Sequence, residues 1–247
     1  MSLMIQTVNI GRGVSWITEA WPYFTRNPLG WIAAIIVLFI LSIVISFIPF
    51  FGSLLVNLCY PVFVGGYMLG CMAHQQGKSF EFQHIFSAFK EPYVIRLILL
   101  GGLYLLATFV VVILMLVLSF IMLGGFEIFH QFEHGQVDDI GSYATDFILL
   151  LLIFVTLVTP VIMGMWFAPA IIVTSEESVT SAILMSFNAC LKNILPFTLY
   201  ALLVLVLAIV AAIPLMLGYL VLLPVLSASV YVAFLDCFKS DTVDVVR

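Results

Sequence analysis

The chain has 247 residues, of which 64% are hydrophobic and only 9% are charged. A soluble domain has about 25% charged residues, and so little charge could not keep a surface of this size in solution. The net charge is -5, and the sequence contains no block of basic residues. Both features argue against nucleic acid as a partner. The composition therefore indicates an integral membrane protein.

Six apolar stretches follow one another along the chain, each near the ~20 residues that a helix needs to cross ~30 Å of hydrocarbon. They are expected at residues 31–48, 54–72, 97–123, 147–173, 195–213 and 219–238. Taken in pairs, they form three hairpins within a single integral membrane domain, residues 1–247. The sequence thus predicts an all-α fold, a polytopic membrane bundle of six transmembrane helices.

The basic residues indicate the orientation of this bundle. When the six stretches are threaded through a membrane, every Lys and Arg falls on one side: Arg12, Arg26, Lys78, Lys90, Arg96, Lys192, Lys239 and Arg247. The other side carries only acidic charges: Glu127, Glu133, Asp138, Asp139 and Asp146. Because basic residues accumulate on the cytoplasmic side, we expect both termini in the cytoplasm and the connection at 124–146 outside.

An amphipathic segment precedes each hairpin on the basic side. The apolar positions at helical spacing are Val14, Ile17, Trp21 and Phe24 in the first, Phe82, Ile85, Phe86 and Phe89 in the second, and Ile183, Leu184, Phe187 and Leu191 in the third. Before the third, Thr174 and Glu177 have the spacing of a capping box. Helices of this kind lie in the membrane interface, so we expect them to anchor the hairpins or to dock lipid or a partner.

The second, fourth and sixth stretches share a Pro-Val step followed by small residues, at Pro61, Pro160 and Pro224. One interpretation is a triplicated hairpin, and the other is that Pro and small residues are simply common in membrane helices. Small residues allow helix backbones to approach closely. The predicted helix-packing residues are Gly65, Gly66, Gly70, Gly164 and Ala228.

Four features lead to a resemblance. They are the junction from Trp21 to Pro28, the Pro61-Val62 helix that ends in Gly70-Cys71, the segment from Phe80 to Phe89, and Trp166-Phe167-Ala168-Pro169 followed by a Ser-rich helix to Asn193. Together they resemble an uncharacterised family of bacterial six-helix inner-membrane proteins. More distantly, the layout is similar to the membrane domain that accompanies some glycerophosphodiester phosphodiesterases. The resemblance implies a bacterial inner membrane, but no activity and no site residues.

Ionisable residues are essentially missing from the six stretches, apart from Asp236 near the inner end of the last. Ion-coupled carriers usually keep such residues at depth, so coupled transport is disfavoured. A passive route lined by hydroxyl and amide groups remains an alternative, through Ser42, Asn57, Thr108, Thr156, Thr159 and Ser227. The other interpretation is that these groups bond to backbone or to neighbouring helices.

The outer connection contains a possible metal site. Glu127, His130 and His134 share one face if the segment is helical, and three such ligands could hold zinc or another divalent ion. The His-x-x-Glu-His spacing also matches inverzincin peptidases, which need a further ligand from a supporting helix. Nearby glycines favour a mobile, solvated acidic loop instead, so we expect no cofactor.

The leading hypothesis is a non-enzymatic scaffold or accessory protein that engages membrane lipid, another membrane protein or a second copy of itself. The first alternative is a passive transporter or channel for a small or amphipathic solute, which an organised cavity between the hairpins would favour. The second is a metal-dependent membrane enzyme that uses the outer connection.

Overall fold

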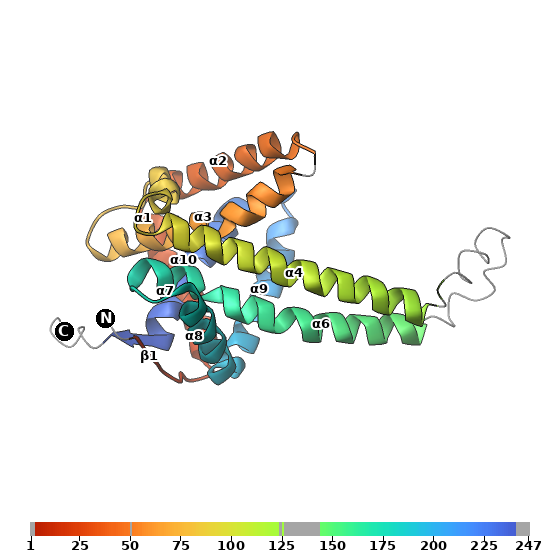
Figure 1. Cartoon of the computed structure of the whole chain (residues 1–247). Helices are drawn as coiled ribbons and strands as arrows, with labels where there is room; N and C mark the ends of the chain where they lie inside the picture. The colour runs from red at the N-terminus through yellow and green to blue at the C-terminus, as the bar shows by residue number, and fades with distance from the viewer. Residues whose placement is uncertain (1–2, 50, 124, 126–143, 241–247) are drawn as a thin grey trace. The chain divides into compact units, whose positions relative to one another are not determined.

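The computed structural model describes residues 3–49, 51–123, 125 and 144–240 (Figure 1). Helices make up most of this part of the chain, and one pair of short strands joins its two ends. The elements are β1 (Leu3–Ile5), α1 (Arg12–Arg26), α2 (Pro28–Ser46), α3 (Phe51–Gln75), the 3₁₀ helix η1 (Phe82–Phe89), α4 (Val94–Met122), α6 (Ala144–Trp166), α7 (Ala168–Thr174), α8 (Val179–Lys192), α9 (Ile194–Ala212), α10 (Tyr219–Cys237) and β2 (Phe238–Ser240).

Six helical segments of the described chain are long and apolar enough to cross a membrane. They are Pro28–Ser46, Phe51–Gln75, Val94–Met122, Ala144–Thr174, Ile194–Ala212 and Tyr219–Cys237. The predicted stretches end within one helical turn of these bounds. The protein is therefore a multi-pass membrane protein, and the all-α polytopic bundle predicted from the sequence is confirmed.

The chain divides into two compact units. The smaller unit, Leu103–Ile162, contains most of α4 and α6, whose side chains are largely exposed. The larger unit, Met1–Gly102 with Met163–Arg247, contains the remaining helices and nearly all of the buried hydrophobic residues. The larger unit is therefore where a site can be built.

The fourth apolar stretch is broken where α6 ends and α7 begins. Pro169 near the start of α7 has no N–H to donate and would clash with the carbonyl of the preceding turn in a continuous helix. In a continuous helix the Phe167 N–H would donate to the Met163 carbonyl. The fully buried hydroxyl of Ser186 on α8 lies between these two groups instead. It accepts from the Phe167 N–H at 2.9 Å and donates to the Met163 carbonyl at 2.7 Å. A side chain thus replaces the backbone hydrogen bond that the break removes.

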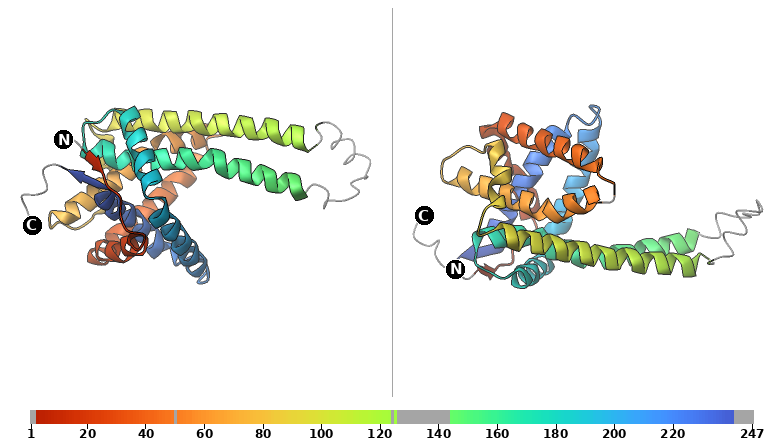
Figure 2. Two further views of the ribbon diagram at one scale, coloured as in Figure 1. Left: turned by 90° about the horizontal axis from the view of Figure 1, so that it is seen from below. Right: turned by 45° about the horizontal axis from the view of Figure 1, so that its top comes forward.

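The two ends of the described chain lie side by side. Strands β1 and β2 pair in antiparallel register, with Met4 opposite Lys239 (Figures 1 and 2). Beyond β1, the buried side chain of Asn193 accepts from the Val8 N–H at 2.8 Å and donates to the Gln6 carbonyl at 2.9 Å. The junction between α8 and α9 therefore holds the N-terminal segment in place.

The packed face of α1 is formed by residues of mixed size. Gly13, Trp16, Ala20 and Phe24 are buried, and the helix contacts α9 and α10. Of the predicted apolar positions only Phe24 is buried, whereas Val14 and Trp21 are exposed. The expectation that this helix lies in the membrane interface, with such apolar side chains toward lipid, remains a prediction. In a membrane protein small residues allow close helix contact, and large apolar side chains can face lipid.

The third amphipathic segment has the same arrangement. On α8 the buried residues are Ala182, Ser186, Ala189 and Cys190, while Leu184 and Leu191 are exposed. The predicted capping box is also wrong. The N-cap of α8 is Ser178, whose hydroxyl accepts from the Ser181 N–H, and Thr174 belongs to α7.

The second amphipathic segment is a 3₁₀ helix rather than an α-helix. Side chains three residues apart lie on one face of a 3₁₀ helix, so Ile85 and Ala88 are buried together against α3. The aromatic residues Phe82, Phe86 and Phe89 remain partly exposed.

Candidate functional site

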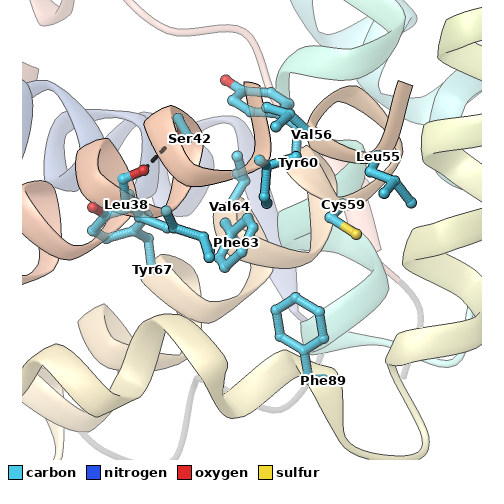
Figure 3. Close-up of a pocket in the computed structure, with 12 residues that line it drawn as sticks. Leu38, Ser42, Leu55, Val56, Cys59, Tyr60, Phe63, Val64, Tyr67 and Phe89 are labelled. Carbon is cyan, nitrogen blue, oxygen red and sulfur yellow. Dashed lines mark hydrogen bonds between the residues drawn. The ribbon is translucent and has the colours of Figure 1, made fainter. Parts of the chain in front are cut away.

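An apolar pocket lies between α2 and α3 (Figure 3). Its volume is about 360 Å³, within the range of ~300–1,000 Å³ that is usual for small-molecule sites. The twelve lining residues come from the second half of α2, the first two-thirds of α3 and the end of η1: Leu38, Leu41, Ser42, Ile45, Leu55, Val56, Cys59, Tyr60, Phe63, Val64, Tyr67 and Phe89. None of these described residues is charged.

Tyr67, which lines the pocket, belongs to a stack of three aromatic rings. Trp31 lies face to face with Phe80, with ring centroids 3.8 Å apart, and stacks on Tyr67 at 5.6 Å. The Trp31 indole N–H donates to the Tyr23 carbonyl at 2.9 Å. Asn27 fixes the start of α2, because its side chain accepts from the Gly30 N–H and donates to the Phe80 carbonyl. The stack is therefore held in place.

η1 forms one wall, and glycines on α3 bring it close. A side chain at Gly66 would overlap the backbone carbonyl of Ile85, and one at Gly70 would meet the ring of Phe80. Further along α3, the ring of Phe63 packs edge-on against Phe89, with centroids 5.1 Å apart. The absence of side chains on one face of α3 thus allows η1 to lie close, and Phe89 of η1 lines the pocket.

The predicted helix-packing residues have various neighbours. Gly65 faces the side chains of Leu97, Val173 and Ala88, and Gly66 and Gly70 face η1 and the residues before it. Gly164 faces Ile183 of α8, and Ala228 is fully buried on α10. A shared interface of the second, fourth and sixth apolar helices remains a prediction.

The hydroxyl and amide groups suggested as the lining of a solute route bond within their own helices. Each of five donates to a carbonyl four residues earlier at 2.6–2.9 Å: Ser42, Asn57, Thr156, Thr159 and Ser227. The sixth, Thr108, is exposed on α4. A polar side chain bonded in this way has its hydrogen-bonding capacity largely used by the backbone. Ser42 lines the pocket, but its proton is already donated to Leu38.

The predicted metal ligands Glu127, His130 and His134 lie outside the described residues. Within the part of the chain that the structure does describe, no group of three His, Cys, Asp or Glu residues is placed to hold a metal ion.

Sequence reasoning missed a cluster of charged residues at the end of α10. Arg12 donates to Asp236 at 2.6 Å and to Glu19 at 2.6 Å, and the Trp16 indole N–H donates to Asp236 at 2.8 Å. Hydrogen bonds from the guanidinium to Glu19 and Asp236 raise the pKa of Arg12. A signal was present in the sequence, because a single carboxylate in an apolar stretch needs a partner.

Comparison with known proteins gives no further assignment. Neither a protein-family model, nor a curated protein, nor a solved structure matches this chain. The pocket and the charge distribution are therefore the features that bear on its role.

Proposed function

We propose that this chain is a non-enzymatic integral protein of a bacterial inner membrane, which acts as an accessory or scaffold protein by holding a lipid acyl chain between α2 and α3. The observation that carries the proposal is the pocket of about 360 Å³, which is lined mainly by apolar side chains and includes Tyr67 of the aromatic stack. An acyl chain is the apolar ligand that a membrane supplies to every such pocket.

The chemistry of the pocket favours lipid over a polar solute. A solute route needs polar groups that can replace water, whereas the Ser42 hydroxyl donates to its own helix. A hydrocarbon chain needs only shape and dispersion contacts. The other named partners, another membrane protein or a second copy of this chain, could use the same bound lipid or the exposed apolar faces of the helices.

The orientation and the inner-membrane location rest on the basic residues. The structure supports a common side for several of them, because their segments contact one another. Arg26 donates to the Gly77 carbonyl beside Lys78, and Arg96 donates to the carbonyls of Ser175 and Glu177 at 3.2 Å. By the positive-inside rule this side is cytoplasmic, and the sequence resemblance implies a bacterial inner membrane.

Photo-crosslinking tests the proposal. The protein is placed in vesicles of phosphatidylethanolamine and phosphatidylglycerol that contain a trace of phospholipid with a diazirine in one acyl chain. After illumination, peptide mass spectrometry locates the crosslinks. We expect a dominant set on α2 and α3 at the pocket residues. Val56→Trp, which fills the pocket, should remove that set.

The control is Val206→Trp on α9, where Val206 is exposed and far in sequence from the pocket. It should leave the crosslinks on α2 and α3 unchanged. Crosslinks spread evenly over all exposed apolar residues, with no loss in Val56→Trp, would contradict the proposal.

A further inference from the structure

The turn between α9 and α10 consists of large apolar residues that no part of the larger unit covers. Leu215 is 89% exposed and Met216 is 69% exposed, and both neighbours Ile213 and Leu217 are exposed as well. A turn in water is usually built from Gly, Asn, Asp, Ser or Pro. The composition of this turn therefore indicates an apolar surrounding.

The backbone of this turn is suited to the same surrounding. An unpaired backbone N–H strongly disfavours the placement of a turn in hydrocarbon, because no water is present there to accept its hydrogen bond. Here most of the donors bond locally, from Leu215 to Ile213, Met216 to Ala212, Leu217 to Pro214 and Tyr219 to Met216, at 2.9–3.2 Å. Pro214 has no N–H to satisfy.

The conformation required for these bonds is unusual. Leu215 and Met216 have φ values of 51° and 65°, a left-handed region that bulky residues rarely adopt and that Gly or Asn accepts at lower cost. Leu215 and Met216 therefore cost more backbone free energy at these positions than Gly or Asn would. Exposed side chains of this size offset that cost only in an apolar surrounding.

The turn between α2 and α3 likewise combines exposed apolar residues with locally bonded backbone N–H groups. Phe47, Ile48 and Phe51 are exposed apolar residues. Their N–H groups donate to Val44, Ile45 and Pro49 respectively, and Pro49 has no N–H. In both turns a glycine lets the arms cross closely: a side chain at Gly52 would overlap Ile45, and one at Gly218 would lie 2.6 Å from Ala211.

The lengths of the helices agree with this placement. α2 and α9 have 19 residues each, or ~28 Å at 1.5 Å per residue, slightly less than the ~30 Å of a hydrocarbon core. Both begin two residues after a basic residue, Arg26 for α2 and Lys192 for α9, and these charges suit the headgroup level. No charged residue occurs between Arg26 and Lys78 or between Lys192 and Asp236. The exposed apolar surface of the helices continues without interruption onto the turns.

We infer that the tips of the α2–α3 and α9–α10 hairpins end inside the hydrocarbon of the membrane, in contact with acyl chains, and do not emerge into the aqueous phase on the far side. This inference concerns the hairpin tips and holds whether or not the pocket between α2 and α3 binds lipid.

The test uses single-cysteine variants in which the four native cysteines are replaced by alanine. Leu215→Cys and Phe47→Cys report on the two tips. Thr145→Cys and Gln76→Cys, both at exposed positions, report on the two aqueous sides. Each is exposed to a charged, membrane-impermeant maleimide in intact cells and in inverted vesicles. A nitroxide is attached to the same cysteines for collision measurements with oxygen and with a water-soluble nickel chelate.

We expect the two tip cysteines to resist the maleimide from both sides and to react once the protein is unfolded in dodecyl sulfate. Their nitroxides should collide at least several-fold more often with oxygen, which concentrates in hydrocarbon, than the two aqueous controls do, and rarely with the nickel chelate. Leu217→Cys serves as a second reporter if Leu215→Cys does not accumulate.

Two results would overturn the inference. One is labelling of a tip cysteine from either side at a rate like that of Thr145→Cys or Gln76→Cys. The other is a tip nitroxide that neither oxygen nor the nickel chelate reaches, since protein rather than lipid would then cover it. Labelling of Thr145→Cys only in inverted vesicles would reverse the predicted orientation without affecting the inference about the tips.

Discussion

The two helices of each short hairpin differ in how much of them the protein covers. Nine residues of α3 and ten of α10 are buried, against two of α2 and three of α9. We call α3 and α10 the inner helices, and α2 and α9 the outer helices. In each pair the outer helix is the more apolar one. Hydrophobicity therefore does not indicate which helix is central in this protein.

The difference follows from the solvent. In water, burying apolar surface drives packing, so the most apolar helix is the most buried. In a bilayer, lipid is as apolar as leucine, and helices associate through close packing and hydrogen bonds. The inner helices accordingly contain the small residues and bonded hydroxyls, such as Gly66, Ala228 and Ser229. The outer helices present Leu, Ile, Val and Phe to lipid.

The largest effect is expected when bulk is added to an inner helix. Gly66→Leu on α3 would force a side chain into the Ile85 carbonyl, at the upper end of the ~1–3 kcal/mol typical of overpacking or beyond it. Ala201→Leu makes a comparable enlargement on the outer helix α9, where Ala201 is exposed. Thermal unfolding in detergent should show a large loss for the first variant and none for the second. Equal midpoints would mean that α3 and α9 are equally exposed to lipid.

A smaller change tests the contact of α3 with the start of α4 through two adjacent glycines. A methyl group at Gly101 would overlap the Leu58 carbonyl, whereas one at Gly102 would be 3.9 Å from its nearest neighbour. Gly101→Ala should therefore cost about 1–3 kcal/mol. Gly102→Ala should be neutral or stabilising, by up to ~1 kcal/mol, because alanine favours the helix. The opposite signs can be read from the same unfolding assay, and the reverse order would exclude this register of α3 and α4.

The smallest effect concerns hydroxyl groups. Ser229 of the inner helix α10 pairs with the Tyr200 hydroxyl at 2.7 Å, both buried. Interhelical hydrogen bonds in membranes contribute about 0.6 kcal/mol on average and up to ~1.7, so Ser229→Ala should cost that much. Ser42→Ala on the outer helix α2 removes a bond within one helix and should cost almost nothing. A larger loss for Ser42→Ala would show that its hydroxyl serves a ligand or partner instead.

The sequence predicts the six apolar helices well, because a span needs about 20 apolar residues regardless of its neighbours. The packed faces of α1 and α8 do not follow from the sequence in the same way. The apolar periodicity includes Val14, Trp21, Leu184 and Leu191, which are exposed. In a membrane, large apolar residues face lipid as readily as protein, so their periodicity alone does not identify the packed face.

The site was less predictable than the fold. The sequence indicates that Gly65, Gly66 and Gly70 are packing residues. It does not indicate that η1 is the neighbour of Gly66 and Gly70, because nothing local in 82–89 specifies a 3₁₀ helix. The pocket depends on residues from three elements and on the absence of side chains at α3 glycines. Such a cavity follows from tertiary packing, which single-sequence patterns do not encode.

Native mass spectrometry tests most directly whether a lipid occupies the pocket between the outer helix α2 and the inner helix α3. The protein is released from its membrane in mild detergent, and collisional activation removes loosely bound lipid. We expect one lipid adduct to persist, to be absent from Val56→Trp and to be retained in Val206→Trp. A parent protein without such an adduct, or an adduct of equal abundance in Val56→Trp, would contradict the proposal.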